Sequence, residues 1–160
     1  MSLGLDEAKG KDVEREREVD ASYRTLRIIW LAIMAGVISL FIVTRLVQPS
    51  VIEGGHIAFW MLAAVGLAIF GASFILKYKL QKLAVEKQQP GGVRSAHIIA
   101  FALCEATGIF GLIVHLMTGI QHYYLFFVLS GFGILLHKPQ RDDLLAAYAG
   151  DAIWEARKND

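Results

Sequence analysis

Long apolar blocks alternate with short polar or charged segments along this chain. Each block is apolar all the way round a helix, whereas the helices of a soluble domain carry apolar residues on one face only. Crossing the hydrocarbon core of a membrane takes about 20 helical residues. Blocks of about this length occupy residues 28–47, 57–76, 96–117 and 119–137. The pattern predicts an all-α membrane protein, a four-helix bundle with four transmembrane helices.

The polar flanks define two further regions. Residues 1–27 mix acids and bases with few apolar positions, which is typical of a solvated helix or a disordered arm. Residues 138–160 predict a short amphipathic helix on the membrane surface, with Asp142 or Asp143 capping its start. Its apolar positions are Leu144, Leu145, Tyr148, Ala152 and Trp154. The chain therefore divides into an arm, a transmembrane domain over 28–137, and a tail.

Lysine and arginine residues are distributed unevenly among the loops. They precede the first block, follow the fourth, and occupy the loop between the second and third blocks, but the other two loops have none. Basic loops stay on the cytoplasmic side of a membrane. Both termini are therefore predicted to be cytoplasmic, in a protein of the bacterial inner (plasma) membrane.

An internal repeat emerges when the chain is shifted by 70 positions against itself. The segment that begins at Arg24 then aligns with the segment that begins at Arg94. The aligned pairs include Ile28 with Ile98, Ala32 with Ala102, Ala35 with Glu105 and Leu46 with Leu116. The spacing predicts two related hairpins that enter the membrane in the same orientation.

Glu105 is an acid near the centre of the third apolar block. An ionised carboxylate at that depth costs about 2.5–3.5 kcal/mol, so burial favours the neutral form. One interpretation is structural: the neutral carboxyl donates a hydrogen bond to a backbone carbonyl or to a hydroxyl such as that of Ser39 or Ser130. The other is functional: Glu105 binds a proton or a cation.

Small residues mark the faces on which the helices are expected to pack, because they let two backbones approach closely. The predicted packing positions are Ala32, Ala35, Gly36, Ser39, Ala64, Ala68, Gly71, Ala102 and Gly108.

The segment around Glu105 also resembles a known family. Ala102, Glu105 and Ala106 are followed by an aromatic–Gly–Leu run and a valine, at Phe110, Gly111, Leu112 and Val114, with Arg94 eleven positions before the acid and Gln89 and Pro90 in the preceding loop. This arrangement resembles the proteolipid c-subunit hairpin of rotary ATP synthases, over roughly 60 residues. The resemblance implies that Glu105 is an ion-binding carboxylate. Two additional helices and charged extensions flank the hairpin here, and the second block lacks the dense alternating glycines of that family.

Other chemistry has little support in the sequence. His56, His115 and His122 lie towards the outer side, where membrane histidines sometimes ligate haem or a pigment, but interfacial histidine is the simpler interpretation and no cofactor is expected. The chain carries no motif for a nucleotide, a metal or a catalytic nucleophile, so an enzyme is not predicted. A net charge of +1 gives no support to nucleic-acid binding.

These observations predict a non-catalytic accessory or structural subunit of a larger membrane complex. Its partners would be the lipid bilayer and other membrane subunits or copies of itself. The alternative is a c-subunit-like protein that binds a proton or a cation through Glu105.

Overall fold

The computed structural model describes residues 3–49, 55–87 and 89–147, which form helices joined by short connections and contain no strand. The elements are α1 (Leu3–Leu46), α2 (Gly55–Glu86), α3 (Pro90–Thr118), the 3₁₀ turn η1 (Gln121–Tyr123) and α4 (Tyr124–Leu136). Residues 141–147 form a further helical segment, the tail helix. The predicted all-helical class is confirmed.

Three of these helices are long and apolar enough to cross a membrane: α1 over Val13–Leu46, α2 and α3. With 44, 32 and 29 residues they measure about 66, 48 and 44 Å, more than the roughly 30 Å of a hydrocarbon core. Helix α4 has 13 residues and measures about 20 Å, so the fourth apolar block forms a shorter helix than the other three.

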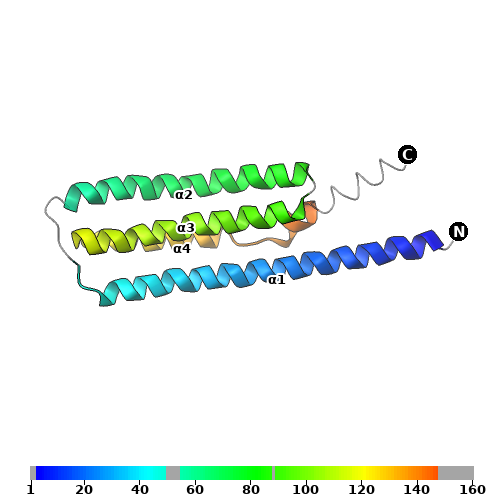
Figure 1. The fold of residues 1–160 in the computed structure, drawn as a ribbon, viewed down its shortest axis with the longest axis horizontal. Coiled ribbons are helices and arrows are strands. Elements are labelled where there is room, and N and C mark those ends of the chain that lie inside the picture. Colours follow the sequence, from blue (N-terminus) through cyan, green and yellow to red (C-terminus); the bar gives the residue numbers. More distant parts are fainter. Residues whose placement is uncertain (1–2, 50–54, 88, 148–160) are drawn as a thin grey trace.

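The central element is α3. It contacts α1, α2 and α4, whereas no Cα atom of α1 lies within 8 Å of one of α2 (Figure 1). In the most apolar stretch of α3, 44% of the residues are buried, against 11% in each of α1 and α2. The two expected hairpins are therefore packed differently, because α3 lies against α4 but α1 does not lie against α2.

The main core joins α3 and α4, with α1 alongside. A Cβ atom on Gly111 would lie 2.9 Å from Cβ of Phe126 and 3.1 Å from the carbonyl oxygen of Tyr123, so the start of α4 packs directly on the backbone of α3. Phe41 of α1 meets Phe127 edge-on at 5.4 Å between ring centroids. The two phenyl rings extend this core from α4 to α1.

A second core lies at the end where α2 stops and α3 starts, which we call the α2/α3 end; the opposite end is the α1/α2 end. Residues 137–140 leave α4 and lead to the tail helix, whose Leu144 and Ala147 are buried. Val19 and Leu26 of α1 pack against the tail helix together with Ala84 and Val93. Tyr148, Ala152 and Trp154 lie outside the described residues.

Helix α1 includes most of the charged arm. It runs without interruption from Leu3 to Leu46, so the arm and the first apolar block are one helix. In Figure 1 this helix extends past the ends of α2 and α3. The arm also enters the second core, because Val19 is only 1% exposed.

Candidate functional site

Glu105 lies half-buried on the side of α3 that faces α1. A Cβ atom on Gly36 of α1 would lie 3.4 Å from Oε1 of Glu105, so the glycine leaves room for the carboxyl. No described residue forms a hydrogen bond or an ion pair with it. The Ser39 hydroxyl donates instead to the carbonyl oxygen of Ala35 at 2.8 Å, and the buried Ser130 hydroxyl has no hydrogen-bond partner in the described part of the chain.

The predicted packing positions fall into two groups. Gly36 lies at the contact with Glu105, and Gly108 lies against Ser130, where a Cβ atom would come within 3.2 Å of the hydroxyl oxygen. The other positions are exposed in the isolated chain: Ala32, Ala35, Ser39, Ala64, Ala68, Gly71 and Ala102. Several of the closest helix contacts are made by other glycines, namely Gly66, Gly111 and Gly133.

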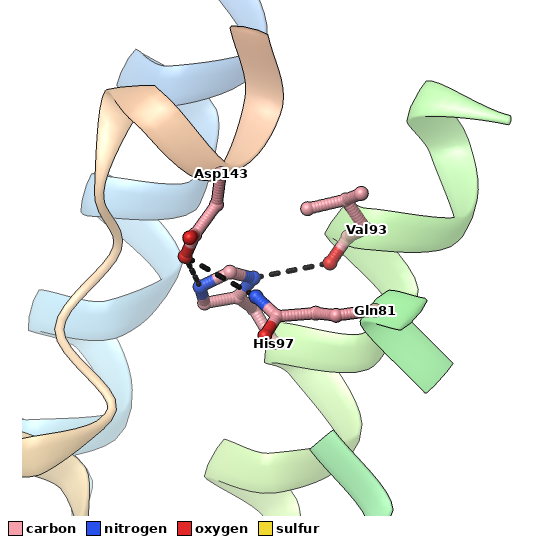
Figure 2. A network of polar contacts seen from close by, with 4 residues as sticks. All are labelled: Gln81, Val93, His97 and Asp143. Carbon is pink, nitrogen blue, oxygen red and sulfur yellow. Dashed lines mark hydrogen bonds and ion pairs between the residues drawn. The ribbon is translucent and has the colours of Figure 1, made fainter. Parts of the chain in front are cut away.

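A polar cluster occupies the α2/α3 end (Figure 2). His97 of α3 is fully buried, and its Nδ1 lies 3.0 Å from the carbonyl oxygen of Val93, one turn earlier. Its Nε2 points towards Asp143 of the tail helix, 3.4 Å from Oδ2. Gln81 of α2 donates through Nε2 to the same oxygen at 3.2 Å. The cluster therefore joins α2, α3 and the tail helix through one carboxylate.

The neighbour of Nδ1 fixes the position of one ring proton of His97. A carbonyl oxygen can only accept, so Nδ1 of His97 carries a proton and donates it to Val93. Nε2 lies 3.4 Å from Oδ2 of Asp143, within ion-pair distance but without hydrogen-bond geometry.

The surroundings of Asp143 favour its ionised form. The contact with His97 holds the pKa of Asp143 below its ordinary value, and the positive charge of Lys77 and the hydrogen bond from Gln81 act in the same direction, while burial opposes them. The side chain of Asp143 thus connects the tail helix to α2 and α3. It does not cap the start of the tail helix, which begins at residue 141.

A second polar group lies beside the first one, between α2, α3 and the end of α4. The Ser73 hydroxyl donates to the carbonyl oxygen of Phe70 at 2.7 Å. Its oxygen therefore accepts from Nε2 of His137 at 3.0 Å, and the Cys104 thiol also donates to it at 3.6 Å. Among the described residues, the hydrogen-bond partner of this thiol is a hydroxyl that is already donating, so none of them bonds to the sulfur as a base. The group holds three elements together and offers no nucleophile.

The fold separates His115 from the other two histidines considered for haem. Nε2 of His115 donates to the carbonyl oxygen of Val47 at 3.0 Å, which closes α1 onto α3. His56 and His122, in contrast, line the same cavity between α2 and α4. No group of three or more metal-ligating side chains occurs among the residues that the structure describes.

Sequence reasoning missed the polar cluster of His97, Asp143 and Gln81. A partial signal was present, because Lys77 and Gln81 are four residues apart and so share one face of α2. Nothing local linked that face to Asp143, which is 62 residues further along. Comparisons of the chain with protein families, curated proteins and solved structures find no match.

Proposed function

We propose that this chain is an integral membrane protein with four crossings and with both ends in the cytoplasm of a bacterium. Three long apolar helices support the first three crossings. The fourth would comprise η1, α4 and residues 137–140, and α4 alone reaches about 20 Å. The loops without lysine or arginine would then face outwards.

Within that membrane, the chain acts as a non-catalytic accessory or structural subunit of a larger complex. The observation that carries this proposal is the open face of α3, defined by Ile99, Ala102 and Ile109, with Glu105 at its edge. These three residues are exposed because α1 and α2 flank α3 without touching each other. A carboxyl beside this face is costly in contact with lipid alone and favours a polar partner.

The exposed small residues of α1 and α2 support the same role. Ala32, Ala35 and Ser39 recur at helical spacing on α1, and Ala64 and Ala68 do so on α2. In a membrane, small residues allow close approach of another helix, whereas lipid contact needs no such pattern. The partner is therefore expected to be one or more transmembrane helices of other subunits.

The test is the native mass of the mildly solubilised protein, with every co-purifying chain identified. One or two copies bound to larger, different subunits are expected. Ala35→Phe and Ala68→Phe should reduce the recovered partner, because each adds a large ring to a proposed contact. Val128→Phe on the exposed side of α4 is the matched control and should leave recovery unchanged. A single chain without partners, extracted directly from native membranes, would refute the role.

The second candidate is a proteolipid-like protein that binds a proton or a cation through Glu105. It is favoured by one observation: this carboxyl lies mid-helix, half-buried, without a hydrogen bond from any described residue. A hydrophobic carbodiimide, which reacts with protonated carboxyls, should then modify Glu105 with a pH dependence, and Glu105→Gln should abolish the modification. Many identical copies in one particle would favour this candidate over the accessory role. Ion movement that is unchanged in Glu105→Gln would exclude it.

A further inference from the structure

A cavity of about 790 Å³ opens between α2 and α4 near the α1/α2 end. This volume lies within the range of small-molecule sites, about 300–1,000 Å³. Its walls are almost entirely apolar: Ala63 and Leu67 continue along α2, and Leu125 and Leu129 along α4. The contact between α2 and α4 is slight beside the contact of either helix with α3, so the space between them is not closed by their own side chains.

The polar groups of the cavity gather at one end. His56 and Trp60 lie on the first turns of α2, and His122 lies in η1. The indole N–H of Trp60 donates to Nε2 of His56 at 3.4 Å. In the neutral ring, the proton of His56 is therefore on Nδ1, where it remains available as a donor. His122 supplies a second imidazole at the same end, so the cavity has a polar mouth and an apolar depth.

The lining also restricts the chemistry of a ligand. Among the residues that the structure describes, no lysine, arginine, aspartate or glutamate lines the cavity, so these residues offer a phosphate head group no fixed positive charge. Aromatic rings form much of the wall near the mouth, with Phe59 meeting Trp60 at 5.3 Å and Phe126 at 6.3 Å between centroids. This combination suits a neutral, planar ring with hydrogen-bond acceptors on its edge and an apolar chain attached.

We propose that this cavity binds a quinone-class ligand. The ring lies among the aromatic side chains, its carbonyl oxygens accept hydrogen bonds from His56 and His122, and its chain extends between α2 and α4 towards Leu67 and Leu129. The site is independent of Glu105, because its described lining residues lie on α2, on α4 and in the connection between α3 and α4, whereas Glu105 lies on α3. The proposal concerns binding and involves no electron transfer.

The experiment measures saturable binding of decylubiquinone to the full-length protein in nanodiscs of neutral phosphatidylcholine. Quenching of Trp60 fluorescence reports occupancy, and Trp60→Phe identifies that share of the signal. His56→Phe and His122→Phe keep a ring but remove the donor, so each should weaken binding roughly tenfold. The dimethyl ether of the reduced ligand, which lacks carbonyl oxygens, should fail to compete.

A second variant pair tests the cavity itself. Leu129→Phe fills the space and should abolish saturation, whereas Leu135→Phe on the exposed side of α4 should leave binding unchanged. Equal affinity in all variants would overturn the proposal, as would full competition by the dimethyl ether. If the protein instead binds haem, with a Soret shift that depends on both His56 and His122, and does not bind quinone, the two histidines would be ligands of a metalloporphyrin and the proposal would be overturned. Retention of phospholipid in place of quinone would also overturn it.

Discussion

His97 and Glu105 are ionisable residues on the same helix, eight positions apart, and the fold treats them in opposite ways. His97 is fully buried, and both of its ring nitrogens face acceptors from within the chain. Glu105 is half-buried beside a glycine, with no polar contact from a described residue. The two residues therefore differ in role. His97 joins elements of the same chain, whereas the carboxyl of Glu105 is left without a polar contact from any described residue.

The largest expected effect follows from removing His97. His97→Ala deletes a buried ring, its bond to Val93 and its ion pair with Asp143, and should lower the free energy of unfolding by about 3 kcal/mol. Unfolding in mixed micelles of mild and denaturing detergent measures the loss. The exposed His122→Ala is the control and should stay within about 0.5 kcal/mol of the parent. Similar values for both variants would mean that the buried cluster contributes little.

The next effect tests the buried face of α3 against an exposed face of α2. Gly111→Ala places a methyl group within 3.1 Å of two side-chain atoms of α4 and of the backbone oxygen of Tyr123 in η1, and should cost about 1–3 kcal/mol. Gly71→Ala is the matched substitution, because no atom lies within 4 Å of its Cβ position. It should be neutral or stabilising by up to about 1 kcal/mol, because alanine favours helix. Both variants can be compared in the same unfolding assay.

A smaller effect should appear with pH. Because the pKa of Asp143 is lowered in the folded protein, its ionised form stabilises the fold fully at pH values above the ordinary aspartate pKa of about 3.9. This contribution is lost as the pH falls through the lowered pKa of the folded protein. The thermal midpoint of the parent should therefore fall between pH 5 and pH 3 by more than that of Asp143→Asn. Because the Asp143 side chain is 33% exposed, salt should reduce the difference. Parallel pH curves for the two proteins would contradict this ion pair.

The smallest effect is expected at Glu105. In the purified single chain, Glu105→Gln and Glu105→Leu should change the free energy of unfolding by less than about 0.5 kcal/mol, because no described residue depends on the carboxyl. The same unfolding assay applies. A loss comparable to that of His97→Ala would show that Glu105 is an internal structural residue, and the contrast between the two residues would no longer hold.

Hydrophobic patterning predicted the helical class and the positions of the long helices, because an apolar block leaves few alternatives to a helix. It did not predict which faces meet. Ala64, Ala68 and Gly71 have the composition of a packing face yet are exposed, while Gly111 and Gly133 make close contacts. The sequence shows that a residue is small, but the rotation of its helix about the helix axis determines whether that residue faces a neighbouring helix.

The polar contacts were harder to predict than the helices for a related reason. His97 and Asp143 come together only because residues 137–140 connect α4 to the tail helix at the α2/α3 end. The residues adjacent to His97 or Asp143 in the sequence do not indicate this course of the chain. Glu105 could be singled out from the sequence because its cost is local, since an acid within an apolar block is unusual wherever the helix lies.

The unbroken course of α1 fixes a rotational phase between its two ends. Each residue turns the helix by about 100°, so the direction in which Val19 and Leu26 point is tied to the direction in which Gly36 and Val37 point. Adding one residue between Leu26 and Gly36 would turn the charged arm by about a quarter of a circle relative to the apolar part of α1, whereas adding four would nearly restore its direction. Whatever holds the arm in place therefore also sets which side of the apolar part of α1 is turned towards a neighbouring chain.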